Sequence, residues 1–228
     1  MTSSQSVLVT GANSSLGQAV GRRLRVLGHQ PIGTVRRPST HNLEEIFDRV
    51  IHIDLGEFES LACLNGSFDA VIHVAAMSYG TAQDLMRVTG LGSRALAERA
   101  VSLNIRKFIH VSSISVYGVI AVSPVSRFSS IQYASPYGVA KWAAECYLND
   151  LSDHFEHVSV RCPAIVGDTV SPHFLARLYK KMSSQEPLIR LYNPEFRFNN
   201  VISESSLSEF LAHLATNETG CPPDIALL

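Results

Sequence analysis

The sequence predicts an α/β protein built on a doubly wound parallel sheet, and three observations support this prediction. Short runs of β-branched and apolar residues alternate with longer segments of helical periodicity, which is typical of βαβ units. The strand candidates are almost continuously apolar, as expected for strands that helices cover on both faces. The 228 residues suffice for one such domain and a small appendage.

The expected elements follow one another in a regular order. The strands are 7–10, 32–35, 50–53, 70–74, 108–111 and 158–160. Apolar residues recur every three or four positions over 16–27 and 91–100, which predicts two helices. A further helix should begin near Ser135 and Pro136, because proline fits the first helical turn, and should run to about 151. Beyond it we expect a helix at 173–182, a strand-like segment at 196–202 and a last helix at 206–215.

The composition favours a globular protein with a small-molecule ligand. Hydrophobic residues make up 46% of the chain and charged residues 17%, and the formal net charge is −1. This balance provides no basic field for nucleic acid or for an anionic membrane, so we expect neither partner. The N-terminus lacks the pattern of a signal peptide and no apolar run is long enough to span a bilayer, which predicts a cytoplasmic protein.

Cysteine and histidine residues do not predict a metal site. Four cysteines, Cys63, Cys146, Cys162 and Cys221, are widely scattered without the spacing of zinc ligands or of a disulfide framework. The nine histidines are equally dispersed. We therefore expect reduced thiols and no metal.

The turn after the first strand has the pattern of a phosphate-binding loop. Residues 10–17 read Thr-Gly-Ala-Asn-Ser-Ser-Leu-Gly and lead directly into a helix. Such a turn presents main-chain N–H groups and a helix N-terminus to a pyrophosphate. An ordinary glycine-containing turn between a strand and a helix is the alternative. The expected cofactor contacts here are Gly11, Asn13, Ser14, Ser15, Leu16 and Gly17.

The end of the second strand indicates which dinucleotide would fit. An acidic residue there would bind the ribose 2′-hydroxyl of NAD, but the chain has Arg36 and Arg37. Two guanidinium groups suit a 2′-phosphate, which favours NADP, with NAD as the alternative. Both arginines would otherwise be solvated surface charges.

Two further strand ends supply candidate cofactor contacts. Asp54 and Leu55 follow the third strand, where they would contact the adenine. Ala75 and Ala76 follow the fourth strand and provide the small side chains needed beside a cofactor. Small residues at this place would also suit sheet packing alone.

Ser113, Tyr137 and Lys141 form the candidate catalytic set. Ser113 ends a strand, and Tyr137 and Lys141 lie four residues apart on the helix that begins near Pro136. They share one helix face, so the ammonium group is expected to lower the pKa of the phenol. Tyr137 would then exchange a proton and Ser113 would hold the substrate oxygen. Tyr137 and Lys141 would also contact the cofactor, Lys141 at the nicotinamide ribose. Taken alone, a tyrosine and a lysine at this spacing also arise by chance.

Together these motifs resemble the extended short-chain dehydrogenase/reductase family, also called the NAD-dependent epimerase/dehydratase family. The resemblance covers roughly residues 6–215 and includes the motifs at 10–17, 54–55, 69–76, 111–118, 137–141 and 161–167. It implies a Rossmann-type fold, selects Ser113 rather than Ser112 as the catalytic serine, and places Pro163 at the cofactor. It also implies a homodimer that pairs through the helix of Tyr137 and Lys141.

The chain departs from the family pattern at several positions. Ser14 stands in place of a motif glycine, and Thr89 stands where relatives commonly have asparagine. Dehydratases of the family carry an Asp-Glu pair beside the active-site hydroxyl, whereas Ser113 is followed by Ile114 and Ser115. A dehydratase is therefore not expected.

The resemblance places the substrate in the C-terminal part of the chain. We expect a dinucleotide-binding domain at 1–160 and a small substrate-side subdomain at 161–228, in which Arg190 and Arg197 clamp a diphosphate or are surface charges. The expected function is hydride transfer at a secondary alcohol or ketone of a nucleotide-linked sugar, as a 4-ketoreductase or 4-epimerase. The alternatives are an NADPH-dependent reductase of a non-sugar carbonyl compound and a non-catalytic NAD(P) sensor on the same fold.

Overall fold

A seven-stranded parallel sheet forms the centre of the molecule. The computed structural model describes residues 3–38, 42–119, 125–167, 174–185, 188, 201–217 and 223–227. The strands of the sheet are β1 (Ser6–Thr10), β2 (Gln30–Val35), β3 (Arg49–His52), β4 (Ala70–His73), β5 (Lys107–Ser113), β6 (Glu156–Cys162) and β9 (Asp224–Ala226). Their order is β3-β2-β1-β4-β5-β6-β9, and each neighbouring pair is parallel. The predicted doubly wound Rossmann-type sheet is confirmed, with its topological switch point between β1 and β4.

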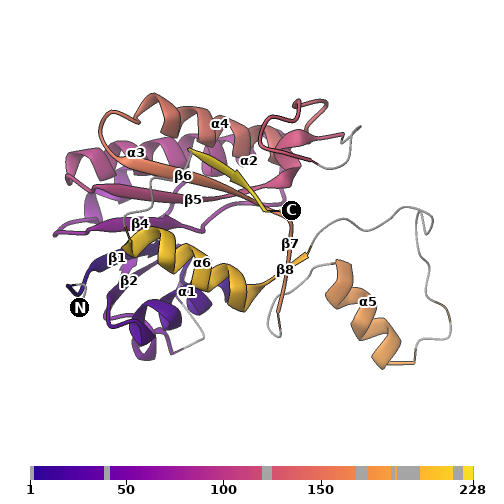
Figure 1. Cartoon of the computed structure of the whole chain (residues 1–228), viewed down its shortest axis with the longest axis horizontal. Helices are drawn as coiled ribbons and strands as arrows, with labels where there is room; N and C mark the ends of the chain where they lie inside the picture. Colours follow the sequence, from indigo (N-terminus) through magenta and orange to yellow (C-terminus); the bar gives the residue numbers. More distant parts are fainter. Residues whose placement is uncertain are drawn as a thin grey trace.

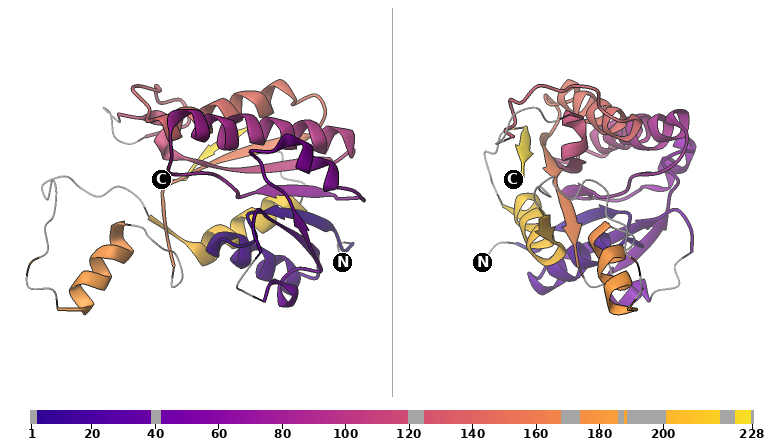
Figure 2. Two further views of the ribbon diagram at one scale, coloured as in Figure 1. Left: turned by 180° about the vertical axis from the view of Figure 1, so that it is seen from behind. Right: turned by 90° about the vertical axis from the view of Figure 1, so that its right-hand side faces the viewer.

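Helices cover both faces of this sheet, as Figures 1 and 2 show. One face carries α1 (Ser15–Val26) and α6 (Glu204–Thr216), and the other carries α3 (Gly92–Ser102) and α4 (Pro136–Asp150). Within β1, Val7 and Val9 pack into the core beneath α1 and α6, whereas Leu8 packs into the core on the opposite face. This period of two explains why strands buried on both faces are continuously apolar.

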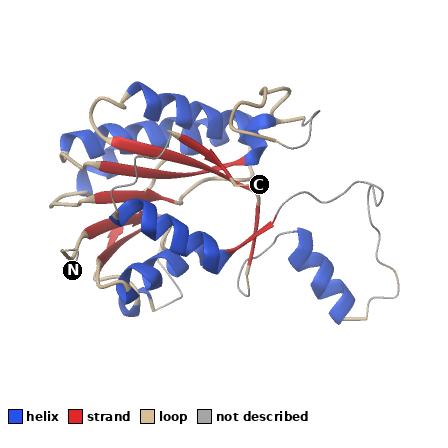
Figure 3. Ribbon diagram, in the orientation of Figure 1, coloured by secondary structure: helices blue, strands red, loops and turns tan. Residues whose placement is uncertain are grey.

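Short helices and a second small sheet complete the secondary structure (Figure 3). The short segments are η1 (Leu43–Glu45), η2 (Phe58–Cys63), α2 (Ala82–Leu85), the π-helical η3 (Met86–Leu91) and η4 (Ile114–Tyr117). The small sheet pairs β7 (Ala164–Val166) with β8 (Val201–Ser203) in parallel, and α5 (Phe174–Ser183) lies between them in the chain. The expected helix at 173–182 is thus present, but most of the strand-like segment at 196–202 lies outside the described residues.

Hydroxyl side chains fix where several helices begin. Ser14, Thr81, Ser135 and Ser203 precede α1, α2, α4 and α6, and each accepts a hydrogen bond from a main-chain N–H of the first turn. These bonds satisfy N–H groups that have no partner within the helix. The predicted start of α4 at Ser135 and Pro136 is confirmed.

Elements after residue 160 contribute to the central sheet as well as to the region beside it. β6 continues to Cys162, β9 pairs with β6, and the apolar side of α6 joins the core cluster of α1. By contrast, β7, β8 and α5 lie outside the central sheet (Figure 1). A division at residue 160 would therefore separate α6 from α1, although both pack in one core. A substrate role for residues 161–228 stays a prediction.

Candidate active site

A cleft of about 1020 Å³ opens where β1, β2, β4, β5 and β6 end. Its walls bring together residues that are far apart in the sequence, including the glycine-containing turn after β1 and the start of α4. Among the predicted site residues, those that line it are Gly11, Asn13, Ser14, Ser15, Leu16, Arg36, Arg37, Asp54, Leu55, Ala75, Ala76, Ser113, Tyr137, Lys141 and Pro163. Gly17 lies just behind the turn, and Arg190 and Arg197 lie outside the described residues.

The turn after β1 is compact because glycine occupies two of its positions. Gly11 has φ +74°, a left-handed conformation, and a Cβ there would stand 3.1 Å from the main chain of Ala75. A Cβ on Gly17 would stand 2.3 Å from the carbonyl oxygen of Gly11. Both positions therefore require glycine for the N-terminus of α1 to face the cleft at this distance from β1.

Ser14, the departure from the glycine pattern, caps the first helix. Its Oγ accepts a hydrogen bond of 3.0 Å from the N–H of Gly17 and donates one of 2.7 Å to the carbonyl oxygen of Gly11. The Ser14 hydroxyl therefore stabilises the turn from within. The close approach of Gly11 to Ala75 is present together with this serine.

The ends of β2 and β3 form the part of the cleft where the adenosine contacts are expected. Arg36 and Arg37 both line it and are exposed, and the main-chain oxygen of Arg37 accepts a hydrogen bond of 2.9 Å from Asn13. The carboxylate of Asp54 accepts a hydrogen bond of 2.8 Å from the N–H of Gly56. This bond fixes the loop that carries Asp54 and Leu55.

A buried polar chain supports the loop after β4. Thr10 accepts a hydrogen bond of 3.1 Å from the N–H of Ala75, and its hydroxyl lies 2.7 Å from Nδ1 of His73. Nε2 of His73 lies 2.8 Å from the hydroxyl of Ser93 on α3. Because burial lowers the pKa of His73 to about 3, aided by the charge of Lys141, this imidazole stays neutral at physiological pH.

Thr89 holds the same loop from the other side. Its hydroxyl donates to the carbonyl oxygen of Met77 and accepts from the N–H of Met77, both at 3.0 Å. The second departure from the family pattern therefore anchors the main chain that follows Ala75 and Ala76.

The three candidate catalytic residues come from two elements that meet at the cleft. Ser113 ends β5, where its hydroxyl accepts a hydrogen bond of 3.1 Å from the N–H of Ser115. Tyr137 and Lys141 lie in the first two turns of α4. Lys141 is 2% exposed, and its Nζ donates a hydrogen bond of 2.6 Å to the carbonyl oxygen of Val111.

Burial dominates the protonation of this set. It raises the pKa of the Tyr137 phenol to about 12, with a smaller contribution from Cys162. It lowers the pKa of Lys141 to about 8, and Cys162 and Glu145 partly oppose that shift. The expectation that Lys141 lowers the phenol pKa is wrong in this structure, because loss of hydration dominates and the ammonium group donates to Val111.

Several cleft residues were not predicted from the sequence. Cys162 is buried beside Tyr137 and Lys141, and burial raises its thiol pKa to about 12. Glu204, in the first turn of α6, accepts a hydrogen bond from the hydroxyl of Ser15. No sequence motif marks Glu204 as a neighbour of the turn, since this contact depends on α6 packing beside α1. Met77, Ser78 and Tyr79 also line the cleft.

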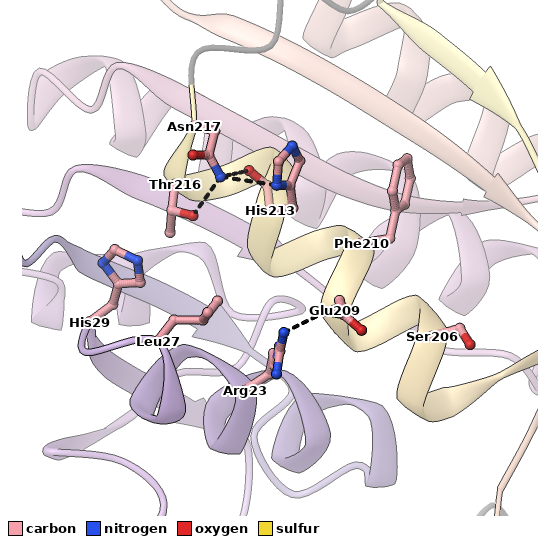
Figure 4. A pocket seen from close by; sticks show the side chains of 9 residues that line it. All are labelled: Arg23, Leu27, His29, Ser206, Glu209, Phe210, His213, Thr216 and Asn217. Carbon is pink, nitrogen blue, oxygen red and sulfur yellow. Dashed lines mark hydrogen bonds and ion pairs between the residues drawn. The ribbon is translucent and has the colours of Figure 1, made fainter. Parts of the chain in front are cut away.

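A second, smaller groove lies between the C-terminal half of α1 and the length of α6, and Figure 4 shows its side chains. Arg23 and Glu209 form an ion pair across it. None of the predicted site residues lines this groove.

Within the part of the chain that the structure describes, no group of three or more histidine, cysteine or acidic residues is arranged to hold a metal ion. No described helix is both long and apolar enough to cross a membrane.

The residues of the large cleft fit a dinucleotide. Gly11 and Gly17 have no side chains, and a Cβ at either position would meet main chain, so the backbone of this turn can approach a pyrophosphate closely. The N-terminus of α1 favours negative charge at the same place. Cationic side chains stand at one end of the cleft and titratable hydroxyl and amine groups at the other. Fold and cleft therefore define a dinucleotide-binding α/β protein.

The chain belongs to the NAD-dependent epimerase/dehydratase family, whose model matches residues 7–197. It is 31% identical over 163 residues to a UDP-glucose 4-epimerase of Mycolicibacterium smegmatis, and this alignment covers 62% of this chain and 50% of the relative. It is 28% identical over 151 residues to a dTDP-glucose 4,6-dehydratase of Streptomyces niveus, covering 60% and 44%. The chain thus spans about half the length of these curated relatives.

A solved structure has the same fold. MoeE5 in complex with UDP-glucuronic acid and NAD superposes with a TM-score of 0.83 at 24% sequence identity, over 97% of this chain and 75% of that chain. At this identity the likeness shows the fold.

Proposed function

We propose that the chain transfers hydride between NAD(P) and a secondary alcohol or ketone of a nucleotide-linked sugar, as a 4-ketoreductase or 4-epimerase. The observation that carries this proposal is the single cleft that joins the turn after β1 to Ser113, Tyr137 and Lys141. The expected reaction needs a phosphate-binding end and a proton-transfer end in one space.

In this proposal the cofactor lies along the cleft. The turn at Gly11 and the N-terminus of α1 bind the pyrophosphate, Arg36 and Arg37 bind a 2′-phosphate, and Lys141 binds the nicotinamide ribose. When bound, the nicotinamide would supply or accept the hydride. The small side chains of Ala75 and Ala76 leave room beside it.

Tyr137 handles the proton in this mechanism. A phenol whose pKa is raised to about 12 is protonated at neutral pH, so it can donate its proton to the carbonyl oxygen during reduction. In the direction of oxidation the phenol must first lose its proton, which the positive charge of an oxidised nicotinamide would favour. Ser113 holds the reacting oxygen by its hydroxyl group.

The relatives support a nucleotide sugar as the substrate class. Their names refer to UDP-glucose and dTDP-glucose, and the solved relative binds UDP-glucuronic acid. A carboxylate that could remove a sugar proton is missing next to Ser113, since Ile114 and Ser115 follow it. We therefore favour reduction or epimerisation over dehydration, and keep Arg190 and Arg197 as proposed diphosphate contacts.

We also propose a homodimer that pairs through α4. Trp142 and Val139 on this helix are 42% and 38% exposed, and Cys146 is exposed. A large aromatic side chain at the centre of such a face suits an interface core. Light scattering at tens of micromolar protein should give twice the monomer mass, whereas a strictly monomeric mass would exclude this dimer.

The substrate class can be tested with a panel of UDP- and dTDP-linked sugars and their 4-keto forms, incubated with NAD, NADH or NADPH. Product masses and chromatographic retention should show a 4-epimer or a reduced sugar. Turnover only with non-sugar carbonyl compounds would replace the sugar by that substrate class. Cofactor binding without turnover on either panel would indicate an NAD(P) sensor.

A further inference from the structure

A buried ion pair lies behind the candidate catalytic residues. It joins Glu145 on α4 to Arg161 on β6, and the side chain of each is 8% exposed. Nη2 of Arg161 stands 2.6 Å from one carboxylate oxygen of Glu145, and Nε stands 3.1 Å from both oxygens. The planar guanidinium group thus fixes the carboxylate by several bonds in one geometry.

The pair reaches the segment around Ser113 from two sides. The hydroxyl of Ser112 donates to Glu145 at 2.5 Å, and Nη1 of Arg161 donates to the Tyr117 hydroxyl at 2.9 Å. Ser112 precedes Ser113 on β5, and Tyr117 ends the short helix η4 that Ser113 caps. Glu145 and Arg161 therefore hold the chain on both sides of Ser113.

Glu145 also lies one helical turn beyond Lys141, so both side chains lie on the same face of α4. The other titratable groups that interact electrostatically with Lys141 are His73 on β4, His110 on β5 and Cys162 on β6, and Tyr137 precedes Lys141 by one turn of α4. Burial lowers the pKa of both histidines and raises those of Tyr137 and Cys162 to about 12, so these four groups are neutral at pH 7. Glu145 is the carboxylate that acts on Lys141, whereas a second carboxylate, Asp224 on β9, lies 3.5 Å from Nη1 of Arg161.

Stability alone does not explain a buried ion pair at this place. Removing two charges from water is costly, and apolar side chains of similar volume often stabilise a fold equally well. The position of the pair, between the strand of Ser113 and the helix of Lys141, points to a role in arranging these residues.

We propose that Glu145, held by Arg161, is a positioning residue: it fixes the Ser112–Ser113 segment and supplies the negative charge that keeps Lys141 an ammonium ion. The proposal rests on the proposed function for the catalytic roles of Ser113 and Lys141. The arrangement itself can be measured without cofactor or substrate.

The test is the titration of Lys141 in Glu145→Gln. Glutamine keeps the shape and the acceptor for Ser112 but loses the charge. The chain has four lysines, so ¹³C labelling of lysine Cε gives few NMR signals, and Lys141→Met assigns the signal of interest. The wild-type pKa should be near 8. In Glu145→Gln it should be lower, whereas Glu145→Asp, which retains the charge, should bring it back toward the wild-type value.

Glu98→Gln provides the matched control. Glu98 lies four residues after its partner Arg94 on α3, as Glu145 lies four residues after Lys141 on α4. The side chains of Glu98 and Arg94 are both about half exposed. Glu98→Gln should leave the pKa of Lys141 unchanged. This result would show that loss of a negative charge at another place in the protein does not lower the pKa of Lys141.

A second variant covers the case in which Glu145→Gln does not fold by circular dichroism. Glu145→Met combined with Arg161→Met removes both charges together, and the pKa of Lys141 should again fall below the wild-type value. A wild-type pKa in either folded variant would overturn the proposal. Since the titration uses no cofactor or substrate, its outcome is independent of whether the proposed reaction occurs.

Discussion

Arg36 and Arg37 directly follow β2 and line the cleft where this strand ends. Both side chains are exposed, and no carboxylate of the described residues forms an ion pair with either one. Their charge is therefore available to an anion in the cleft. A 2′-phosphate would be bound there by charge-assisted hydrogen bonds, each of which is stronger than a bond between neutral groups.

The first prediction concerns the choice of cofactor. Calorimetry should show that NADPH binds more tightly than NADH by about 1–3 kcal/mol, the range for hydrogen bonds to charged groups. Replacing both arginines by serine should remove this preference while the unfolding temperature stays unchanged. Equal affinities of the wild-type protein for the two cofactors would show that the arginines are solvated surface charges.

The residues of the site were predictable to different degrees. Strand ends and helical spacing led to Ser113, Tyr137 and Lys141, with the family resemblance deciding for Ser113 over Ser112; the three residues do line one cleft, and their catalytic roles stay a prediction. The protonation state of Tyr137 was not predicted, because it depends on burial by neighbouring elements, which raises the pKa of its phenol to about 12. The contact of Glu204 with Ser15 likewise depends on the tertiary packing of α6.

Among the elements, α1 shows how one substitution in a motif changes the source of local stability. Ser14 takes the place of a glycine and caps the helix by accepting from the N–H of Gly17 at 3.0 Å. Its backbone is extended, with φ −76° and ψ 154°, as is typical of a capping residue. The helix therefore keeps the geometry of the glycine pattern and gains a side-chain cap.

The second prediction is that Ser14→Ala lowers the free energy of unfolding by about 1 kcal/mol, since it removes this cap. Ser14→Gly should lower it by only a few tenths of a kcal/mol, because glycine is itself accepted at this position. Urea denaturation followed by circular dichroism measures both changes. Equal losses for the two variants would contradict the capping role.

The helices and strands themselves were largely predictable. Each of the six predicted strands is present, and β2, β5 and β6 are longer than expected because their pairing with neighbouring strands continues beyond the apolar runs. The seventh strand, β9, has only three residues and was missed. It depends on pairing with β6 at the sheet edge rather than on a local pattern. The packing of α6 beside α1 was not visible in the periodicity either.

At the scale of the whole molecule, buried histidines link folding to pH. His73 and His110 lie side by side on β4 and β5 and are fully buried, and burial lowers the pKa of both imidazoles. The folded protein keeps His73 neutral down to about pH 3, whereas the unfolded chain takes up a proton near its ordinary pKa of 6.5. The unfolded state thus gains protons first, and stability falls as the pH drops below 6.5.

The third prediction follows from this sign. Between pH 7 and pH 5, His73 alone should lower the free energy of unfolding by about 2 kcal/mol. His73→Gln, which keeps polar atoms near Thr10 and Ser93 but does not titrate, should reduce the loss by about that amount. Urea denaturation of both proteins at the two pH values gives the comparison. An identical pH dependence would mean that His73 takes up its proton at the same pH in the folded and unfolded states, which contradicts its lowered pKa.

The most direct test of the central claim is the turnover of Tyr137→Phe on a substrate verified with the wild-type protein. This substitution removes only the hydroxyl, so turnover should fall by at least about 10²-fold, as expected for loss of a positioned acid or base. The affinity for NAD(P), measured by calorimetry on the same preparation, should stay within about threefold of the wild type, because the proposed pyrophosphate contacts come from the turn after β1 and the proposed ribose contact from Lys141. Near-wild-type turnover of the variant would contradict proton transfer by Tyr137 and the proposed hydride-transfer mechanism.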